Sequence, residues 1–502
     1  MTGLSPRIDG RRVTRELELE ADFVVVGSGP GGAASARVLA ESGASTIVLE
    51  EGGEPPTPPA TNGFAAMSTL YRDLGTSVLL GHAPIPYLQG VVLGGTSVIN
   101  GAISWRLPRD VHEEWVRDDP AIGEALPFSE IEARTDRVET DLGIAPTSPE
   151  VAGRKSSIVA EAAERLGWAH RPISRNTPGC RGSGRCLEGC PNGAKASMDR
   201  VHLRIAEERG ATIASSMKVT KLLTSKNRVT EVLGRGKGGG RFRVRPRRAV
   251  VVAASAVGTP ALLIRSGITD GPVGQGFQCH PGISMAARFG EPITAWLGAT
   301  QGHEVIEFRG EGIKLEVLGY DLSILLLRTK GVGRALAADK EQLDRFLNMG
   351  AAIRASAQGS VTPGLFGGVR ARFQPNSADL AKIRRGLRLM GELLLEAGAL
   401  EVLPGVFGFT PRITDRRDLE RLELEGPRDA RAYSMAVTHM FGTARMGSDP
   451  RRSVVRPDFS HHRVRNLFVA DSSVFPTNTG VNPQTSILAL ATLCGEQVMR
   501  SA

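Results

Sequence analysis

The sequence predicts an α/β fold whose first unit is Rossmann-like, and three stretches of the chain support this prediction. Residues 22–50 form an apolar strand, a glycine turn, a helix and a second apolar strand. Residues 249–268 again place an apolar strand before a small-residue turn and a helix. Residues 466–499 contain a strand that ends on Asp471, a loop, and a helix that begins at Pro483. Strands that run through glycine turns into helices are typical of Rossmann-like folds.

The first unit carries the fingerprint of a dinucleotide site. Gly27, Gly29 and Gly32 form the pattern Gly-x-Gly-x-x-Gly between the strand and the helix. Gly27 allows the tight turn, Gly29 lets the backbone approach a pyrophosphate, and Gly32 lets the helix pack on the strand. The second strand ends on Glu50, where a carboxylate can accept hydrogen bonds from ribose hydroxyls. A glycine turn in another α/β protein is the alternative, and this unit alone does not distinguish FAD from NAD.

The composition limits the classes of protein that need to be considered. The chain has 502 residues, 41% of them hydrophobic, which is enough for two to three domain-sized units. The net charge of +9 comes from basic and acidic residues that are interleaved along the chain, so it indicates a solvated surface and no nucleic-acid partner. We find no secretory signal and no run of roughly 20 apolar residues. No transmembrane segment is therefore expected, and the expected location is the cytoplasm.

Five further segments are rich in glycine and other small residues. They read GGTSVINGA (94–102), GTPALLIRSGI (258–268), VGQGFQCHPG (273–282), HMFGTARMG (439–447) and GVNPQTS (480–486). Together with the nucleotide fingerprint, they resemble the motifs of the glucose–methanol–choline (GMC) oxidoreductase family of FAD enzymes, in the order of that family. The resemblance spans residues 22–499.

The resemblance implies a discontinuous Rossmann-like FAD-binding domain and an α+β substrate domain whose antiparallel sheet covers the flavin ring. We expect the FAD-binding domain in three parts, with the active-site residues in the third and a cysteine-bearing cover segment between the first two. In chain order, the expected segments are the first FAD part (15–125), the cover segment (126–189), the second FAD part (190–290), the substrate domain (291–429) and the third FAD part (430–502).

The resemblance also implies a catalytic pair. In this family a histidine and a second histidine or asparagine face the flavin N5, and the matching positions are His439 and Asn482. His439 would accept the hydroxyl proton of an alcohol, both residues would hold the developing alkoxide, and the carbon would give hydride to N5. The alternatives are a histidine of the core and an asparagine that, directly before Pro483, only caps the last helix.

Three other histidines compete with His439 as candidate bases. His280 matches a family position near the domain junction, where a structural role is expected. His461 and His462 lie in a polar run, so they are expected to face solvent.

Further residues are expected to contact FAD because of the resemblance. Asn100 matches a family position beside the flavin. Ile99 stands where some members carry a histidine that bonds FAD covalently, so FAD is expected to bind non-covalently. The remaining expected contacts are Gly94, Gly95, Ser97, Asp471 and Pro483, in addition to Gly27, Gly29, Gly32 and Glu50.

A cysteine-rich segment, CRGSGRCLEGCP, covers residues 180–191 and places Cys180, Cys186 and Cys190 close together. Zinc lacks an evident fourth ligand here, and a disulfide is unusual in the cytoplasm. Some bacterial sugar dehydrogenases of the family carry a 3Fe-4S cluster in a similar segment, with a further cysteine where this chain has Arg181. An iron–sulfur cluster and reduced cysteines in a structural loop both stay open.

We therefore expect FAD-dependent oxidation of a primary or secondary alcohol, such as a sugar or a lipid alcohol, to a carbonyl. The reduced flavin would pass electrons to O2 or, with a cluster, to an electron-acceptor protein such as a cytochrome. A cyanohydrin lyase and a non-catalytic flavin protein of an electron-transfer chain are the rival classes. Residues 314–327 mix apolar and polar residues in strand-like runs that could line a substrate pocket, but they do not select one substrate.

Overall fold

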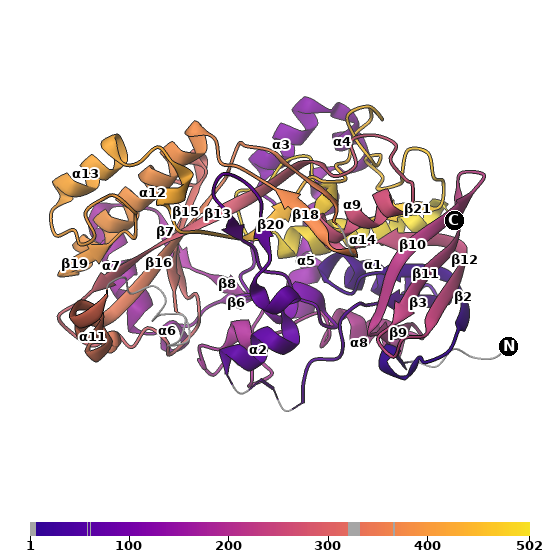
Figure 1. Ribbon diagram of the computed structural model, residues 1–502, viewed down its shortest axis with the longest axis horizontal. Helices are drawn as coiled ribbons and strands as arrows, with labels where there is room; N and C mark the ends of the chain where they lie inside the picture. The colour runs from indigo at the N-terminus through magenta and orange to yellow at the C-terminus, as the bar shows by residue number, and fades with distance from the viewer. Residues whose placement is uncertain (1–6, 58, 61, 320–331, 365–366, 502) are drawn as a thin grey trace.

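Two large sheets lie side by side in the computed structural model, one at the right and one at the left of Figure 1. The structure describes residues 7–57, 59–60, 62–319, 332–364 and 367–501. Residues 320–327, which belong to the predicted pocket-lining stretch, lie outside the described residues.

The first sheet collects strands from both ends of the chain and from its middle. Its eight strands are β1 (Arg7–Asp9), β2 (Leu17–Val26), β3 (Thr46–Leu49), β9 (Thr212–Ser215), β10 (Met217–Ser225), β11 (Arg228–Gly236), β12 (Arg241–Val252) and β21 (Leu467–Val469). They follow the order β1-β9-β3-β2-β12-β11-β10, with β21 paired to β12. Among the described strands of this sheet, the pairs β10–β11 and β11–β12 are antiparallel, and the other pairs are parallel. This is the Rossmann-like unit that the sequence predicts.

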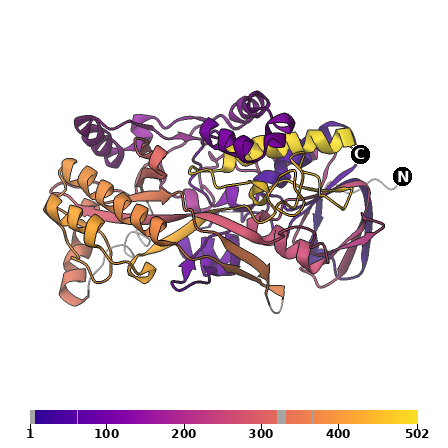
Figure 2. The same cartoon turned by 90° about the horizontal axis from the view of Figure 1, so that it is seen from above.

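Helices cover the first sheet, which is why its central strands are apolar on both faces. Phe23, Val24 and Val25 of β2 are fully buried, as is expected of a parallel strand that is covered on both faces. The covering helices are α1 (Pro30–Glu41), α5 (Phe128–Leu142), α8 (His202–Glu208) and α14 (Gln484–Ser501). Helix α1 packs against both α8 and α14, and α14 also packs against α5. Figure 2 shows α14 as the long yellow helix beside the first sheet.

The second sheet is antiparallel throughout its described pairs. Its nine strands are β7 (His170–Pro172), β13 (Gln275–Arg288), β14 (His303–Val305), β15 (Ile313–Leu318), β16 (Phe346–Ile353), β17 (Gly359–Pro363), β18 (Val369–Arg372), β19 (Glu401–Leu403) and β20 (Met435–Phe441). The order is β18-β17-β13-β16-β15-β14-β7, and both β19 and β20 pair with β13. The expected α/β fold with an antiparallel second sheet is therefore confirmed.

The remaining elements are helices and short strands that lie outside the two large sheets. The helices are α2 (Gly63–Leu70), α3 (Arg109–Asp118), α4 (Pro120–Ala125), α6 (Pro149–Ala152), α7 (Arg154–Leu166), α9 (Ser255–Arg265), α11 (Gly333–Glu341), α12 (Ser377–Glu396) and α13 (Arg416–Glu425). Two short antiparallel pairs join β4 (Val78–Leu79) to β5 (Ile85–Pro86) and β6 (Ala145–Pro146) to β8 (Ser174–Arg175). Helices α12 and α13 lie at the end of the molecule opposite the C-terminus (Figures 1 and 2).

Strands β13 and β20 both pair within the second sheet. The sequence segments that contain them, 190–290 and 430–502, were assigned to the FAD-binding domain. The domain boundaries themselves stay a prediction.

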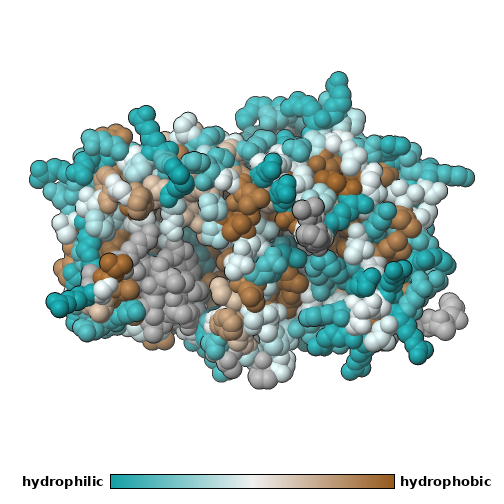
Figure 3. Space-filling view, in the orientation of Figure 1, coloured by the Kyte–Doolittle hydropathy of each residue, from teal (hydrophilic) through white to brown (hydrophobic). Residues whose placement is uncertain are grey.

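The surface agrees with the interleaved charges of the sequence. Hydrophilic side chains cover much of the face shown in Figure 3, with apolar residues in separate patches between them. Within the described part of the chain, none of the helices combines the length and the apolar character needed to cross a bilayer.

Candidate active site

A cavity of about 720 Å³ is lined by residues of both sheets. One group of lining residues follows the ends of β2, β3 and β12, and another comes from β13, β15, β16 and β20. Ten of the predicted site residues line it: Gly27, Gly29, Glu50, Gly95, Ser97, Asn100, His439, Asp471, Asn482 and Pro483. Gly32 and Gly94 lie outside the lining. The structure thus brings together residues that are more than 400 positions apart in the chain.

The three glycines of the fingerprint, in the turn between β2 and α1, differ in what a Cβ atom at each position would meet. Gly27 has a φ of +100°, and a Cβ there would lie 2.3 Å from the carbonyl oxygen of Ala253. Gly29 lies directly before α1, and a Cβ on it would meet open space within 4 Å. A Cβ on Gly32 would lie 1.9 Å from the carbonyl oxygen of Gly27. Gly29 therefore leaves room for a ligand at the helix N-terminus, whereas Gly27 and Gly32 make the turn and the packing feasible.

The segment GGTSVINGA lies against this turn. A Cβ on Gly95 would lie 2.8 Å from the Cα atom of Gly29, and the N–H of Gly94 donates to Ser28 Oγ at 3.0 Å. Ser97 Oγ donates to the carbonyl oxygen of Gly94 at 2.6 Å and accepts from a backbone N–H at 3.0 Å. Gly94 and Ser97 thus shape the loop, while Gly95 brings the backbone into the cavity.

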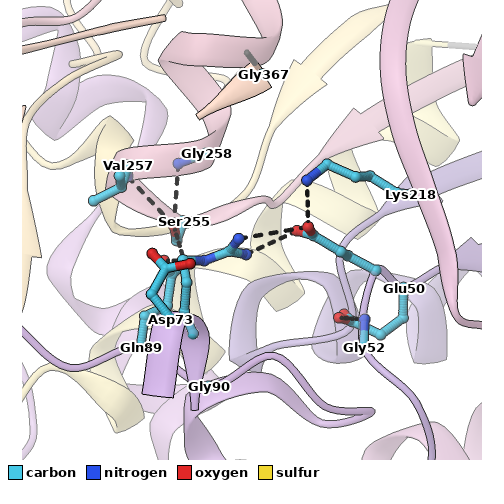
Figure 4. A network of polar contacts seen from close by, with 12 residues as sticks. Glu50, Gly52, Asp73, Gln89, Gly90, Lys218, Ser255, Val257, Gly258 and Gly367 are labelled. Carbon is cyan, nitrogen blue, oxygen red and sulfur yellow. Dashed lines mark hydrogen bonds and ion pairs between the residues drawn. The ribbon is translucent and has the colours of Figure 1, made fainter. Parts of the chain in front are cut away.

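Glu50 lies at the end of the cavity formed by the first sheet. Its carboxylate accepts from the N–H of Ser28 at 3.0 Å, from Ser28 Oγ at 2.6 Å and from the N–H of Gly52 at 2.7 Å. Burial raises the pKa of Glu50, and these donors oppose the rise. Figure 4 shows Glu50 and Gly52 beside Lys218, which pairs with the neighbouring carboxylate of Glu51 at 2.5 Å.

Ser255 and Asp471 hold the loops at the ends of β12 and β21 together. Asp471 accepts from the N–H of Ser255 at 2.9 Å and from Thr259 Oγ1 at 2.5 Å. Ser255 Oγ accepts from Gln89 Nε2 at 2.7 Å and from two N–H groups of helix α9, as Figure 4 shows. Burial raises the pKa of Asp471. Asp471 therefore fixes the cavity wall through the same carboxylate that was expected to contact a cofactor.

One residue of the cavity lining has an amide whose nitrogen lacks a partner in the described part of the chain. Asn100 Nδ2 donates to Gln484 Oε1 at 2.5 Å, and Asn100 Oδ1 accepts from the N–H of Ala102 at 3.0 Å. Gln484 Nε2 is buried and has no hydrogen-bond partner among the described residues, although Gln484 lines the cavity. Such a donor requires an acceptor from a ligand or from water. Sequence reasoning missed Gln484, which lies inside the GVNPQTS motif.

His439 and Asn482 meet at the second-sheet end of the cavity. Nε2 of His439 lies 3.4 Å from Nδ2 of Asn482, and Nδ1 of His439 lies 3.2 Å from Nδ1 of His280. Burial, with a smaller contribution from the positive charge of Lys314, lowers the pKa of His439 to about 3. His439 is therefore a neutral imidazole at neutral pH, as a proton acceptor must be.

The helix-cap alternative for Asn482 is wrong. Its Oδ1 accepts from Lys314 Nζ at 2.6 Å and its Nδ2 faces His439, so the amide is turned towards these two side chains. The last helix begins at Gln484, one residue after the predicted start at Pro483.

The sequence predicted the roles of two residues near this pair, His280 and Lys314, only in part. His280 was expected to be structural, and it is fully engaged: it contacts His439, Asn478 Oδ1 at 3.1 Å and the N–H of Gly480 at 2.9 Å. Lys314 was missed as a site residue. Lys314 and Glu316 alternate with apolar residues of β15 and are buried, a pattern that marks charged side chains facing a polar cluster.

The expectation that His461 faces solvent is also wrong. His461 is fully buried, and its Nδ1 accepts from the N–H groups of Arg463 and Val464 at 3.1 and 3.0 Å. A polar sequence neighbourhood misled the prediction, because the imidazole closes a turn instead of facing water. His462 is half-buried and contacts Ser453 Oγ at 2.8 Å.

The three clustered cysteines have separate partners. Cys186 Sγ accepts from Arg175 Nη2 at 2.9 Å, Cys190 Sγ from the N–H of Lys195 at 3.3 Å, and Cys180 Sγ from the N–H of Gly182 at 3.5 Å. Across the described ranges, no three His, Cys, Asp or Glu side chains are grouped so that they could hold a metal ion. The iron–sulfur prediction thus receives no support, and all five cysteines are free thiols.

Comparison with protein families and curated proteins gives a consistent result. Residues 60–282 and 362–491 match the N-terminal and C-terminal models described as GMC oxidoreductase. An uncharacterised GMC-type oxidoreductase of Mycobacterium tuberculosis is 34% identical over 98% of this chain and 77% of that protein. A long-chain-alcohol oxidase of Arabidopsis thaliana is 26% identical over 96% of this chain and 69% of the relative.

Solved structures share the fold at low sequence identity. Pyridoxine 4-oxidase from Mesorbium loti matches with a TM-score of 0.69 and 19% identity, over 96% of this chain and 99% of that one. A formate oxidase variant of Aspergillus oryzae, studied for FAD modification, matches with a TM-score of 0.73 and 15% identity, over 96% and 98% of the two chains.

Proposed function

This chain belongs to the GMC oxidoreductase family and is therefore an oxidoreductase, and we propose that it uses non-covalently bound FAD to oxidise a primary or secondary alcohol to a carbonyl compound. The observation that carries the proposal is the single cavity that the glycine turn and Glu50 line at one end and His439 and Asn482 at the other. A dinucleotide at the first end and an alcohol at the second would meet in its middle.

The cavity fits FAD in three respects. Gly29 leaves open space in front of the N-terminus of α1, where the positive end of the helix dipole favours a pyrophosphate. Glu50 retains acceptor capacity for ribose hydroxyls at the end of β3. Gln484 offers a buried N–H donor that has no partner among the described residues, as a polar ring edge would require. Ile99 lines the cavity and has no group that could form a covalent bond to the cofactor.

His439 and Asn482 supply the chemistry at the other end. Neutral His439 accepts the hydroxyl proton of the alcohol on Nε2 and becomes an imidazolium. Asn482 Nδ2 donates a hydrogen bond to the oxygen while negative charge develops on it. FAD, when bound, supplies the acceptor for the hydride that leaves the carbinol carbon. Both side chains are half-buried, and this partial exclusion of water strengthens their electrostatic effect on the oxygen.

The test is anaerobic addition of alcohols to the purified yellow protein, with benzyl alcohol, 1-dodecanol, glycerol and D-fructose as probes. We expect at least one alcohol to bleach the flavin band. His439→Ala should slow bleaching about 100-fold or more, since general-base catalysis contributes on this scale. The control His462→Ala changes a half-buried histidine outside the cavity lining.

Three outcomes would contradict the proposal in different ways. Purified protein that contains no flavin would contradict the proposed FAD cofactor. Flavin that stays yellow with every alcohol would favour a lyase or a non-catalytic flavin protein. An unchanged bleaching rate in His439→Ala would contradict the role of His439 as the base. Peroxide formation in air would then show whether O2 accepts the electrons.

A further inference from the structure

A buried group of charges lies directly behind the catalytic pair. Lys314 of β15 forms an ion pair with Glu304 of the neighbouring strand β14 at 2.9 Å, and both side chains are fully buried. Trp105 Nε1 donates to Glu304 at 2.9 Å and Arg171 Nε at 2.8 Å, so the carboxylate has three donors. Burial raises the pKa of Glu304, but Lys314 and Arg171 outweigh this and lower the pKa overall. A buried ion pair with this many hydrogen bonds is well compensated.

Lys314 also decides how the amide of Asn482 is oriented. Lys314 Nζ lies 2.6 Å from Asn482 Oδ1. An ammonium group can only donate hydrogen bonds, so the amide atom that faces it must be the oxygen. The NH2 group of Asn482 is then left to face Nε2 of His439, at 3.4 Å. The contact is long, as active-site contacts often are before a substrate binds.

The orientation of the amide has a consequence for the tautomer of His439. A donor opposite Nε2 favours the imidazole that has its lone pair on Nε2 and its proton on Nδ1. That proton can be donated to His280 Nδ1, 3.2 Å away. His280 Nε2 meets two partners with opposite preferences, the Asn478 Oδ1 acceptor at 3.1 Å and the Gly480 N–H donor at 2.9 Å. His280 therefore does not fix the tautomer of His439, whereas the charged contact from Lys314 to Asn482 does.

We propose that Lys314, held by Glu304, is a positioning residue that orients the amide of Asn482 and thereby keeps a lone pair on Nε2 of His439. This inference rests on the proposed function of His439 as the base. Without Lys314 the amide is free to turn and to present its oxygen to His439. The imidazole would then carry its proton on Nε2, where it cannot accept the proton of an alcohol.

Three substitutions separate the parts of this proposal. Lys314→Met removes the charge and the donor, whereas Lys314→Gln removes the charge and keeps an N–H donor for Asn482. Lys314→Met combined with Glu304→Gln removes the carboxylate that lies 2.9 Å from Lys314 Nζ, which guards against loss of folding. Glu316, whose carboxylate lies 3.6 Å from Lys314 Nζ, keeps the hydrogen bond from Gln301 Nε2 at 3.0 Å in every variant. Lys155→Met is the matched control, because Lys155 is equally buried but donates to the carbonyl oxygen of Leu297.

Two measurements are made on the flavin-loaded protein. The first is the anaerobic bleaching rate with the fastest alcohol of the four probes, analysed as a maximal rate and a half-saturating concentration. The second is deuterium exchange at the imidazole C2 position of His439 against pH, read by mass spectrometry, which needs no substrate. Lys314→Met should lower the maximal rate about 100-fold with little change in half-saturation, and Lys314→Gln should recover most of the loss. The pKa of His439 should rise in all three Lys314 variants, and Lys155→Met should change neither measurement.

The failures can be told apart. A parental bleaching rate in Lys314→Met, or a pKa of His439 that does not move, overturns the positioning role. Equal losses in Lys314→Met and Lys314→Gln overturn orientation of the amide as its cause. A parent protein that none of the probes bleaches contradicts the proposed function, and the exchange measurement still decides whether Lys314 acts on His439. If Lys314→Met does not fold, the double variant and Lys314→Gln decide in its place.

Discussion

Nδ1 of His280 lies 3.2 Å from Nδ1 of His439, although the two residues belong to different strands. Strands β13 and β20 pair antiparallel, and their register shifts between Cys279 and Pro281. The irregularity at His280 lets its ring face the ring of His439, with the ring planes at 81°. His280 is therefore a hydrogen-bond partner of the candidate base as well as a part of the sheet.

We expect His280→Phe to slow flavin bleaching about tenfold. Phenylalanine retains the bulk of the ring but cannot hold His439 by a hydrogen bond, which contributes about 1 kcal/mol. The measurement is the anaerobic bleaching rate at saturating alcohol. His170→Phe is the control, because His170 contacts a different histidine, His303, at 2.8 Å. Equal rates in His280→Phe and the parent would show that the contact does not orient His439.

Asn482→Asp should move the acid side of the pH–rate profile to higher pH. Burial and Lys314 lower the pKa of His439 to about 3, so in the parent the base form persists down to that pH. A carboxylate at position 482 would stabilise the imidazolium and offset the charge of Lys314, raising the pKa of His439 by roughly one unit or more. The bleaching rate would then fall at a higher pH than in the parent. A profile that does not move would show that the residue at position 482 does not act on His439.

Local patterns were sufficient to predict the nucleotide unit. The second apolar strand predicted within residues 22–50 is β3 (Thr46–Leu49), and the helix after the glycine turn is α1. These elements depend on apolar runs and on glycines, whose steric reasons act within a few residues or against the adjacent strand. Motif order also predicted which distant loops share the cavity.

Contacts between distant strands could not be predicted from such patterns. Lys314 is buried against Glu304, ten residues earlier on β14, and against Asn482, which lies before α14 and far away in sequence. The prediction that His461 faces solvent failed because its partners, two N–H groups of a turn, cannot be identified from the polar sequence around it. The cysteine pattern was compatible with a cluster, whereas the fold gives each thiol a partner of its own.

We expect protein purified without oxygen to contain no stoichiometric iron or acid-labile sulfide. Cys186 Sγ is held by Arg175, and the thiols of Cys180 and Cys190 accept separate backbone N–H groups. Arg175, Lys195 and burial act on Cys186 together, and the two cations prevail, so the pKa of its thiol is lowered. The Cys190→Ser variant should therefore keep the parental flavin spectrum. About three or four iron atoms per chain, lost in Cys190→Ser, would contradict this prediction.

His202, at the start of α8, makes the folded protein sensitive to acid. It is buried, and neither ring nitrogen has a hydrogen-bond partner among the described residues. Burial lowers its pKa from 6.5 to about 4. In the unfolded chain the imidazole binds a proton at pH values below 6.5, whereas in the folded chain it stays neutral down to about 4. Its contribution to stability is thus fully present above pH 6.5 and is lost as the pH falls through this window.

The variant His202→Leu removes this titration and should flatten the dependence of stability on pH. Between pH 7 and pH 5, the parent should lose about 2 kcal/mol more unfolding free energy than the variant, because one unit of pKa shift corresponds to about 1.4 kcal/mol. Urea-induced unfolding at the two pH values, with the same FAD content, measures the difference. His82→Leu is the control, since the side chain of His82 is 60% exposed. A parent and a His202→Leu variant that lose the same free energy would show that His202 is protonated in the folded state, so that water or a local opening reaches the start of α8.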